Sequence, residues 1–315
     1  MPASYPPLPP AGDHGGDGLA VARALGLDPG ELLDLSQNMN ALAPPVAPVV
    51  ARHLEALSRY PDPLEATGQL ADALGVDPGR LLLTNGGSEA IHLVATVLGG
   101  RVRSEPEFGL HPRGGRGPGW RGAEAPVWRT DPHSPTGRLA GPAERVDVWD
   151  EAFYALATGR WTAGRAGAVV VGSLTKTFHC PGLRLGYVVL PPESGADSGD
   201  LIDRLRAAQP HWSVSTLALA VLPDLLALAD LPAWATGIAG LRAELTRLLQ
   251  AHGLRVEAAD APWVLVHEPG LREHLAPHGV LVRDCTSFGM PGVARIAVPG
   301  PDGLGRLATA LRGMV

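Results

Sequence analysis

The chain has 315 residues, enough for one large domain or two moderate ones, and 45% of them are hydrophobic, which is ample for a core. Its net charge of −6 gives no indication of a nucleic-acid partner, and its two cysteines do not suggest a disulfide framework. The first ten residues lack the apolar segment of a secretion signal, and no apolar run reaches the roughly 20 residues of a membrane span. We therefore expect a soluble, cytoplasmic protein that binds neither nucleic acid nor membrane.

The N-terminal part begins with a Pro-rich lead over residues 1–12. Next to His14, Gly15 and Gly16 form a turn whose amides and imidazole can face an anion, although a plain N-terminal turn explains the same residues. Apolar residues at helical spacing predict three helices in this part of the chain. The predicted helices are Gly18–Leu25, Ala47–Leu57 and Leu64–Leu74.

A glycine turn joins a predicted strand, Arg80–Thr84, to a predicted helix, Ala90–Leu98. The turn reads Asn-Gly-Gly-Ser-Glu over residues 85–89. The first turn of a helix has amides without intrahelical partners, so Gly87 and Ser88 are candidates for binding a phosphate group. Many strand-to-helix turns contain paired glycines, and the motif alone is only moderately specific.

Residues 102–128 show no clear period and are rich in Gly, Pro and Arg, so we expect mostly loop. Phe108 in this stretch is consistent with a buried core phenylalanine. The loop arginines do not indicate a nucleic-acid surface, because the net charge is acidic and few aromatic residues lie between them.

The most informative residue is Lys176, the single lysine among 26 basic residues. Arginine cannot replace lysine where an amine must lose its proton and attack a carbonyl, and pyridoxal phosphate is the commonest cofactor held through such a Schiff base. A predicted strand, Ala166–Gly172, leads to this lysine, while Ser173 and Arg184 flank it and can bind a phosphate. Asp150 ends another predicted strand, Arg145–Trp149, and suits either a protonated ring nitrogen or a helix N-cap.

The C-terminal third predicts the helices and strands of a smaller unit. The predicted helices are Asp200–Ala208, Leu241–His252 and Leu271–Ala276, and the predicted strands are Trp263–His267 and Gly279–Arg283. Arg295 lies in a later strand, where its planar guanidinium can grip a carboxylate through two parallel bonds; a surface arginine is the alternative. Arg283 is a candidate for binding a phosphate or for a local structural role.

Ser-x-x-Lys, with Arg eight residues on and Gly two beyond, resembles the cofactor site of fold-type I aminotransferases. The chain is similar to the branch that holds histidinol-phosphate aminotransferase and the cobalamin-pathway L-threonine-O-3-phosphate decarboxylase. The similarity rests on His-Gly-Gly at 14–16, Ser-Gln-Asn-Met-Asn at 36–40 and Arg-Asp-Cys-Thr-Ser-Phe at 283–288. The cofactor implied by the resemblance is pyridoxal 5′-phosphate.

The resemblance also implies an α/β fold of three parts and a homodimer. These parts are an N-terminal arm (residues 1–45), a large cofactor-binding domain with a mostly parallel sheet (46–212) and a small α/β C-terminal domain (213–315). Tyr60 is implied to cross the dimer interface and reach the cofactor phosphate of the partner subunit.

The remaining roles are implied residue by residue. For the cofactor, Lys176 holds the aldehyde, Asp150 keeps the ring nitrogen protonated and Phe108 stacks on the ring. Further implied cofactor contacts are Gly87, Ser88, Ser134, Phe153, Tyr154, Ser173 and Arg184. For an amino-acid substrate that is phosphorylated, the implied contacts are Arg295 on the carboxylate, and Arg283, His14, Asn38 and Asn40.

The chain departs from this family pattern at several positions. Ser134 replaces the usual asparagine, and Phe153 replaces the usual tyrosine at the cofactor ring oxygen, with Tyr154 adjacent. Asp17 replaces an asparagine of the arm, and residues 102–128 are shorter than usual. These departures motivate a third hypothesis besides decarboxylase and aminotransferase: a degenerate cofactor-binding protein without turnover. We favour the decarboxylase, because the arm and the 283–288 motif match that branch.

Overall fold

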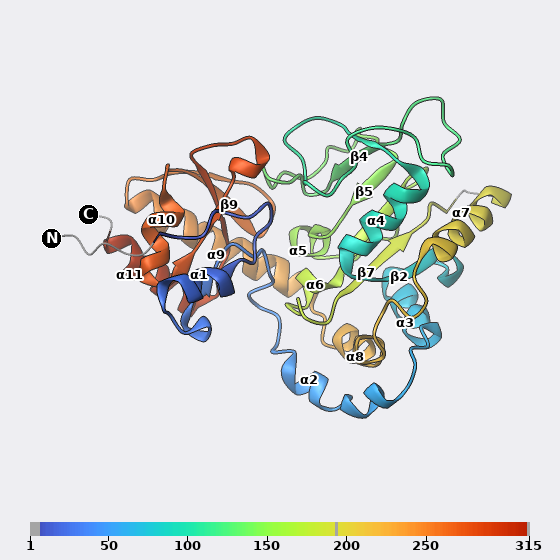
Figure 1. Cartoon of the computed structure of the whole chain (residues 1–315), viewed down its shortest axis with the longest axis horizontal. Helices are drawn as coiled ribbons and strands as arrows, with labels where there is room; N and C mark the ends of the chain where they lie inside the picture. Colours follow the sequence, from blue (N-terminus) through green and yellow to red (C-terminus); the bar gives the residue numbers. More distant parts are fainter. Residues whose placement is uncertain (1–6, 193–194, 314–315) are drawn as a thin grey trace.

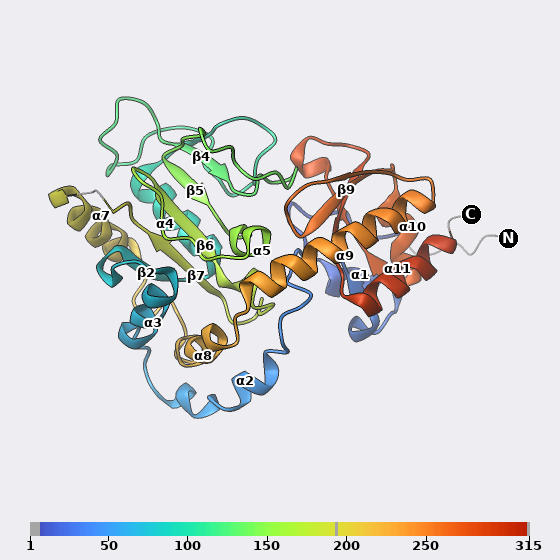
Figure 2. The ribbon, with the colours of Figure 1, turned by 180° about the vertical axis from the view of Figure 1, so that it is seen from behind.

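The computed structural model describes residues 7–192 and 195–313, which form two lobes (Figure 1). The larger lobe contains a six-stranded sheet, and the smaller lobe contains a four-stranded sheet. Helix α9 (Leu231–Ala251) runs from the larger lobe along the smaller one (Figure 2). Its buried residues recur at helical spacing, and the Asp230 carboxylate caps its first turn by accepting a bond from Ala233 N at 3.0 Å.

The large sheet has the strand order β2-β7-β6-β5-β4-β3. Neighbouring strands from β3 to β6 are parallel, whereas β7 is antiparallel to both β6 and β2. The carboxyl ends of β2, β4, β5 and β6 therefore meet at one edge, where α/β folds place their sites. The strands are β2 (Leu81–Asn85), β3 (Arg101–Val102), β4 (Val127–Thr130), β5 (Val148–Asp150), β6 (Val169–Ser173) and β7 (Leu185–Val189).

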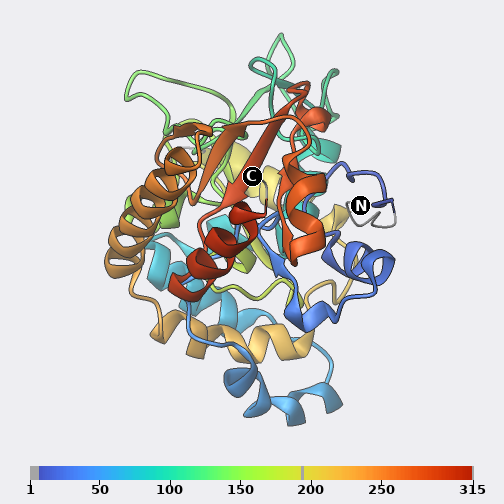
Figure 3. The same ribbon diagram turned by 90° about the vertical axis from the view of Figure 1, so that its left-hand side faces the viewer.

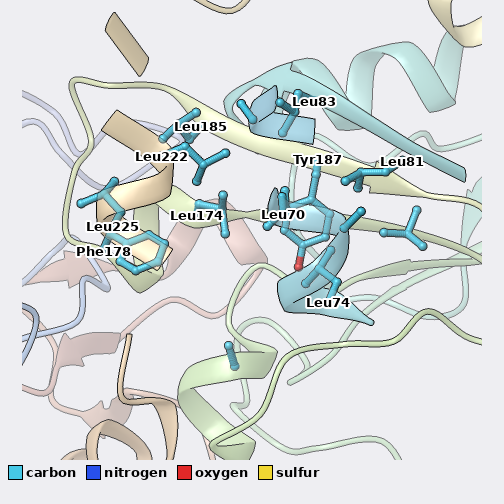
Figure 4. Packing of buried hydrophobic residues seen from close by; sticks show 14 of the residues in the cluster. Leu70, Leu74, Leu81, Leu83, Leu174, Phe178, Leu185, Tyr187, Leu222 and Leu225 are labelled. Atoms are coloured by element: carbon cyan, nitrogen blue, oxygen red, sulfur yellow. The ribbon is translucent and has the colours of Figure 1, made fainter. Parts of the chain in front are cut away.

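Both faces of this sheet are buried, as the near-continuous apolar strands require. On one face, Leu82, Val171 and Val188 pack beneath α4 (Gly86–Leu98) and α7 (Gly195–Ala208). On the other face, Leu81, Leu83 and Tyr187 pack with leucines of α3 and α8 (Figure 4). The helices on this second face are α3 (Leu64–Leu74), α5 (Tyr154–Thr158), α8 (Thr216–Ala227) and the first half of α9.

The small lobe is an antiparallel sheet with the order β11-β12-β9-β8, seen with its helices in Figure 3. Its strands are β8 (Arg255–Ala258), β9 (Trp263–His267), β11 (Arg283–Asp284) and β12 (Val293–Ala297). Alternate residues such as Val264 and Ile296 pack against α9, α10 (Leu271–Leu275) and α11 (Pro301–Arg312). Trp263 and Leu265 point to the opposite face, where Phe153 of the larger lobe packs against them.

The N-terminal arm joins the small lobe through non-local contacts. Its strand β1 (Leu33–Asp34) pairs in parallel with β10 (Val280–Leu281). Helix α1 (Gly18–Leu25) buries Val21 against Leu281 and Ala276. These contacts place the arm beside the face of the small lobe that is turned toward the large sheet.

Several predicted elements differ in extent. The predicted helix Ala47–Leu57 is split into α2 (Ala47–Ala51) and a 3₁₀ turn (Leu54–Ser58), and at the break Arg52 and His53 bind Asp224 at 2.7 and 2.9 Å. The predicted strand Gly279–Arg283 is divided between β10 and β11, which belong to different sheets. Short elements complete the fold: α6 (Leu174–Thr177) and 3₁₀ turns at Pro29–Glu31, Pro78–Arg80, Ala276–His278 and Thr286–Phe288.

Among the described residues, no single helix combines the length and apolar character needed to cross a membrane. Helices α8 and α9 reach that length and composition only when they are taken together, and they are bent by 81° at the break between them.

Candidate functional site

A cavity of about 610 Å³ opens between the two lobes, at the carboxyl ends of the large-sheet strands. Figure 1 shows α6, which carries Lys176, on the side of the larger lobe that faces the smaller one. The residues predicted to contact the cofactor or the substrate all line this cavity, except Asn40, Tyr60 and Tyr154. Residues distant in sequence thus converge on one place from the arm, the large sheet and the small sheet.

The first turn of α4 forms a tight cradle with the residues after Lys176. A Cβ on Gly86, which has φ +77°, would lie 2.5 Å from Arg184 Nη2, and a Cβ on Gly87 would lie 3.2 Å from Ser173 Cβ. Both glycines are needed for this close approach. The free amides of the helix, the Ser173 and Ser88 hydroxyls and the Arg184 guanidinium therefore surround one small space, which suits a phosphate.

Lys176 lies deep in the cavity, beside two arginines and one carboxylate. Burial, together with the nearby charges of Arg295 and Arg184, lowers the pKa of Lys176 from 10.5 to about 8, and Asp150 only partly opposes this shift. Within the part of the chain that the structure describes, Lys176 forms no ion pair. Its Nζ lies 6.0 Å from the centroid of the Phe153 ring. With this lowered pKa, a larger fraction of the Lys176 amine is unprotonated at neutral pH than in an ordinary lysine.

Asp150 ends β5 and lies 6% exposed at the cavity. Its Oδ1 accepts a bond from Ala152 N at 3.0 Å, and its Oδ2 lies 3.1 Å from His111 Nε2. Sequence reasoning missed His111, because it lies in the Gly/Pro-rich segment that was predicted as loop. Its spacing of three residues from Phe108 was the available signal, and the two rings meet edge to face at 5.6 Å.

Glu107 is a second residue that sequence reasoning missed. Its side chain is 1% exposed and accepts bonds from Thr130 Oγ1 at 2.6 Å, Phe108 N at 2.8 Å and Thr130 N at 3.1 Å. A buried carboxylate in an apparently featureless loop needs such donors. The segment predicted as loop is therefore an ordered wall behind Asp150.

Two arginines from the small lobe reach the opposite end of the cavity. Arg295 and Arg283 lie directly across from one another on β12 and β11. Both are buried, at 7% and 5% exposure, and neither forms an ion pair with a carboxylate among the described residues. Burial lowers the pKa of Arg295 to about 9, with a further contribution from Arg283. Two desolvated cations side by side indicate a site for anions.

The neutral partners of these arginines come largely from the arm. The Asn38 amide, with its oxygen toward Arg295, accepts bonds from Nε and Nη2, both at 3.1 Å. Arg283 donates Nη2 to the Asp13 carbonyl at 2.5 Å and to Ser287 Oγ at 3.1 Å, while its buried Nε has no partner among the described residues. Burial and the Arg283 charge lower the pKa of His14, whose ring lies 5.6 Å from that of Phe108.

The arm is fastened at two points. Asn40 is fully buried, and it donates from its backbone N to the Lys176 carbonyl at 3.0 Å and from its Nδ2 to the Thr177 carbonyl at 2.9 Å. It therefore holds the turn that carries Lys176 and does not line the cavity. Asp17 forms an ion pair with Arg272 Nη2 at 2.8 Å. The Arg272 side chain is 2% exposed, which makes this contact a buried anchor for the start of α1.

The other departures from the family pattern occupy separate places. Ser134 and Phe153 both line the cavity, and Phe153 packs edge to face on Trp263 at 4.9 Å. Tyr154 lies away from the cavity, with Arg165 5.5 Å above its ring. Tyr60 is 78% exposed on the large lobe and lies 4.8 Å from the Trp212 ring.

The cavity fits pyridoxal phosphate on the basis of its own residues. The glycine cradle can receive a phosphate, the low-pKa amine of Lys176 can attack an aldehyde, and Asp150 can pair with a protonated ring nitrogen. Phe108 offers an aromatic face at the same cavity. The residues that line this cavity therefore fit this cofactor.

Comparisons with known proteins agree with this reading. The profile described as "Aminotransferase class I and II" matches residues 123–311. The chain is 31% identical to histidinol-phosphate aminotransferase of Halobacterium salinarum, over 88% of this chain and 89% of the relative, and 30% identical to threonine-phosphate decarboxylase of Salmonella typhimurium, over 96% of each. In fold it is similar to histidinol-phosphate aminotransferase from Sinorhizobium meliloti in complex with pyridoxal-5′-phosphate, with a TM-score of 0.71, 18% identity and 95% coverage of each chain.

The matches confirm the predicted fold class and the resemblance to the two-enzyme branch. The relatives that match are enzymes, which favours the two enzymatic hypotheses over that of a protein without turnover. The chain belongs to the class I and II aminotransferase family and is a fold-type I enzyme that depends on pyridoxal phosphate.

Proposed function

We propose that this enzyme decarboxylates a phosphorylated amino acid, with L-threonine O-3-phosphate as the leading candidate. The observation that carries the proposal is the pair of buried guanidinium groups, Arg295 and Arg283, which lack carboxylate partners among the described residues. A substrate that carries both a carboxylate and a phosphate supplies two anions to this pair. The similarity to threonine-phosphate decarboxylase of Salmonella typhimurium supports the same substrate.

For the cofactor, the proposed contacts follow from the cradle and the strand ends. Gly87, Ser88, Ser173 and Arg184 hold the phosphate, Lys176 holds the aldehyde, and Asp150 faces the ring nitrogen. Phe108 covers the ring, and Ser134 and Phe153 stand near its oxygen. When bound, pyridoxal phosphate supplies an electron sink for the carbanion formed at the substrate Cα.

Lys176 carries out the acid–base and nucleophilic work in this proposal. With a pKa of about 8, a much larger fraction of its amine is unprotonated at neutral pH than for an ordinary lysine. In the proposed reaction, the same Nζ holds the proton that is delivered to the substrate Cα. The nearby Arg295 and Arg184 charges keep the amine from holding that proton tightly.

The substrate is oriented by the small lobe and the arm. Arg295 is proposed to fork the carboxylate, with Asn38 holding its guanidinium in position. Arg283, whose Nε lacks a partner, and His14 are proposed to bind the phosphate. In the decarboxylation, the Cα–carboxylate bond breaks, carbon dioxide leaves and a proton is added at Cα, which gives aminopropanol phosphate.

We further propose that the enzyme is a homodimer in which Tyr60 serves the partner's site. Tyr60 and Trp212 form an exposed aromatic pair, and Leu57 and Leu64 beside it are 63% and 78% exposed. Such a concentration of exposed apolar side chains is typical of a protein interface. A second copy of this chain is the proposed partner.

The first experiment combines spectroscopy with product analysis. The purified protein is mixed with pyridoxal phosphate, and wild type is expected to develop a visible absorption band that is missing in Lys176→Ala. L-threonine O-3-phosphate is then added, and we expect equal amounts of carbon dioxide and aminopropanol phosphate. A loss of function in Arg283→Gln, with cofactor binding intact, is expected for the phosphate role. Binding of cofactor without carbon dioxide release would contradict the decarboxylase.

Transamination of a phosphorylated amine or amino acid is the second candidate. The similarity to histidinol-phosphate aminotransferases supports it. The two reactions differ in which bond at Cα breaks, and therefore in their products. A keto or aldehyde product together with pyridoxamine phosphate on the enzyme supports this second candidate, whereas carbon dioxide and a retained amine support the first.

A further inference from the structure

One aromatic ring contacts both of the arginines at the small-lobe end of the cavity. The Arg283 Cζ atom lies 4.7 Å from the centroid of the Phe288 ring, and the Arg295 Cζ atom lies 5.7 Å from the same centroid. Both distances are within the range of a cation–π contact, in which the negative face of an aromatic ring attracts a cation. Phe288 thus meets two cations for which the described residues provide no carboxylate partner.

The Phe288 ring is itself held in a fixed place. It ends the 3₁₀ turn Thr286–Phe288, which follows β11, and it is 8% exposed. It belongs to a buried cluster with Trp263, Leu265 and Val293. Phe288 is not among the residues that line the cavity, so any effect that it has on a substrate passes through the two arginines.

Apart from this shared ring, each guanidinium is held by its own neutral acceptor from the arm. Arg295 donates from Nε and Nη2 to the Asn38 oxygen, both at 3.1 Å. Arg283 donates from Nη2 to the Asp13 carbonyl at 2.5 Å. These bonds fix the two guanidinium groups one at a time, whereas the ring contacts both and therefore relates the position of one to that of the other.

The two arginines need such a common contact because they repel each other. Arg283 and Arg295 lie opposite one another on the antiparallel strands β11 and β12, and both line the cavity. The Cβ atoms of such a pair are about 5 Å apart, and like charges at short range repel more strongly where water is excluded. Attraction of both cations to one rigid ring opposes this repulsion and limits how far the two charged groups can separate.

We propose that Phe288 is a specificity-determining residue that sets the spacing of the Arg283 and Arg295 guanidinium groups and thereby selects the length of the substrate. The inference rests on the proposed function, in which this pair binds the carboxylate and the phosphate of one amino acid. A substrate whose two anions match the spacing reaches both cations at once, whereas a shorter or longer one reaches only one of them fully. The class selected is that of amino acids phosphorylated on the β-oxygen.

The test measures how tightly the holoenzyme binds three acids of different length. Phosphonopropionate, phosphonobutyrate and phosphonopentanoate each have a carboxylate at one end and a phosphonate at the other, and they lack the amine that reacts with the cofactor. Phosphonobutyrate has as many bonds between its two anions as threonine phosphate. By calorimetric titration we expect wild type to bind it about tenfold more tightly than the other two acids, the effect of one weakened hydrogen bond to a charged group.

Phe288→Leu keeps an apolar side chain in the cluster but removes the aromatic face. The preference for phosphonobutyrate is expected to fall from about tenfold to below about threefold, because the two cations lose their common contact. Val293→Ala is the matched control, since it loosens the same cluster without removing an aromatic face, and it is expected to keep the wild-type preference. A purely structural role weakens the binding of all three acids equally, so an unchanged preference in Phe288→Leu overturns the proposal.

Replacement of Phe288 by trifluorophenylalanine covers the case in which Phe288→Leu does not fold. Fluorine withdraws electrons from the ring face and nearly retains the shape of the side chain, so the attraction for cations falls while the packing stays. The preference is expected to fall here too, and retention of the full wild-type preference overturns the proposal. Wild type that binds none of the three acids contradicts the proposed function and, with it, this inference, whereas equal binding of all three by wild type overturns the inference alone.

Discussion

At the scale of single residues, the surroundings of Lys176 make its charged form unfavourable in the folded chain. Its amine is removed from water and stands near the Arg295 and Arg184 guanidinium groups, with only Asp150 to offset them. A lysine in such surroundings destabilises the folded chain when it is charged. The same destabilisation makes it reactive, which is a common trade between stability and function.

This cost predicts that Lys176→Met stabilises the apoprotein at neutral pH. The folded-state pKa of about 8 lies below the unfolded value of 10.5, which corresponds to as much as roughly 3 kcal/mol. Below pH 8 the cost is fully present. Between pH 8 and 10.5 the unfolded state binds more protons, so wild type gains stability as pH rises and the difference from Lys176→Met shrinks. Urea unfolding of both apoproteins from pH 7 to 10 measures this; a difference that is constant with pH contradicts it.

Arg295 gives the second prediction at this scale. Arg295→Lys keeps a positive charge but loses the planar fork and the paired bonds to Asn38. We expect kcat/KM to fall by about 100-fold, or roughly 3 kcal/mol, mainly through KM. The affinity for pyridoxal phosphate should change little. Steady-state kinetics test the expectation, with Arg255→Lys on the exposed strand β8 as the control, and an unchanged KM counts against the carboxylate role.

The sequence identified residues whose chemistry is rare, and missed those whose role depends on burial. Lys176 stands out because it is the single lysine of the chain and because Ser173 and Arg184 flank it. Asp150 stands out because it ends a predicted strand before that lysine. His111 and Glu107 lie in a Gly/Pro-rich stretch without a period, so nothing local distinguishes them from solvated loop residues. Their contacts with Asp150 and Thr130 arise only when the loop folds against the sheet edge.

At the scale of elements, the junction of β2 and α4 depends on glycine. Gly86→Ala places a methyl group 2.5 Å from Arg184 Nη2 and forces alanine to φ +77°. We expect a loss of about 1–2 kcal/mol from the backbone strain alone and a cofactor dissociation constant raised at least about tenfold, because Arg184 must move away from the phosphate. Thermal unfolding and cofactor titration measure the two effects.

The control for this prediction is Gly68→Ala. Gly68 lies inside α3, and a Cβ there meets no atom within 4 Å. Alanine at this position should raise stability by about 0.5–1 kcal/mol and leave cofactor affinity unchanged. If Gly86→Ala behaves like Gly68→Ala, the cradle has no role in binding the phosphate.

The arm provides the second prediction at this scale. Asp17→Ala leaves the nearly buried Arg272 without its principal acid partner, and we expect a loss of about 2–3 kcal/mol. The loosened arm should also raise the substrate KM and expose residues 7–16 to limited proteolysis. Asp13→Ala is the control, because Arg283 binds only the backbone carbonyl of Asp13. Equal protease sensitivity of the two variants contradicts the anchoring role of Asp17.

Helices and strands with a clear local pattern were predicted well, whereas those that depend on contacts distant in sequence were not. Helices α1 and α3 agree in full with the predicted limits, since both have apolar spacing and end at a left-handed glycine. Helix α9 begins ten residues before the predicted Leu241, because Gly237 and Gly240 weaken the local signal. The pairing of β1 with β10 could not be predicted, since each strand has two residues and the pairing joins the two ends of the chain.

At the scale of the whole molecule, the cavity requires both lobes and the arm. The large lobe supplies Lys176, Asp150 and the glycine cradle, and the small sheet supplies Arg283 and Arg295. Among the predicted site residues outside the cavity, Tyr60 lies on the surface of the large lobe with Trp212, which has φ +58° and is 63% exposed. An exposed tryptophan in a strained conformation is consistent with a contact that forms only on assembly.

The homodimer hypothesis predicts that two inactive variants restore activity when they are mixed. If Tyr60 serves the partner's site, Tyr60→Ala and Lys176→Ala are each nearly inactive, but a mixed dimer contains one intact site with the lysine of one chain and the tyrosine of the other. Random exchange of subunits makes half of the dimers mixed, so about one quarter of wild-type activity should return. The measurement is activity after the two variants are unfolded and refolded together, with separately refolded samples as controls. If Tyr60 acts within its own chain, the mixture of the two variants stays inactive. In that case Trp212→Arg, which should dissociate the dimer, also leaves the activity at the wild-type level.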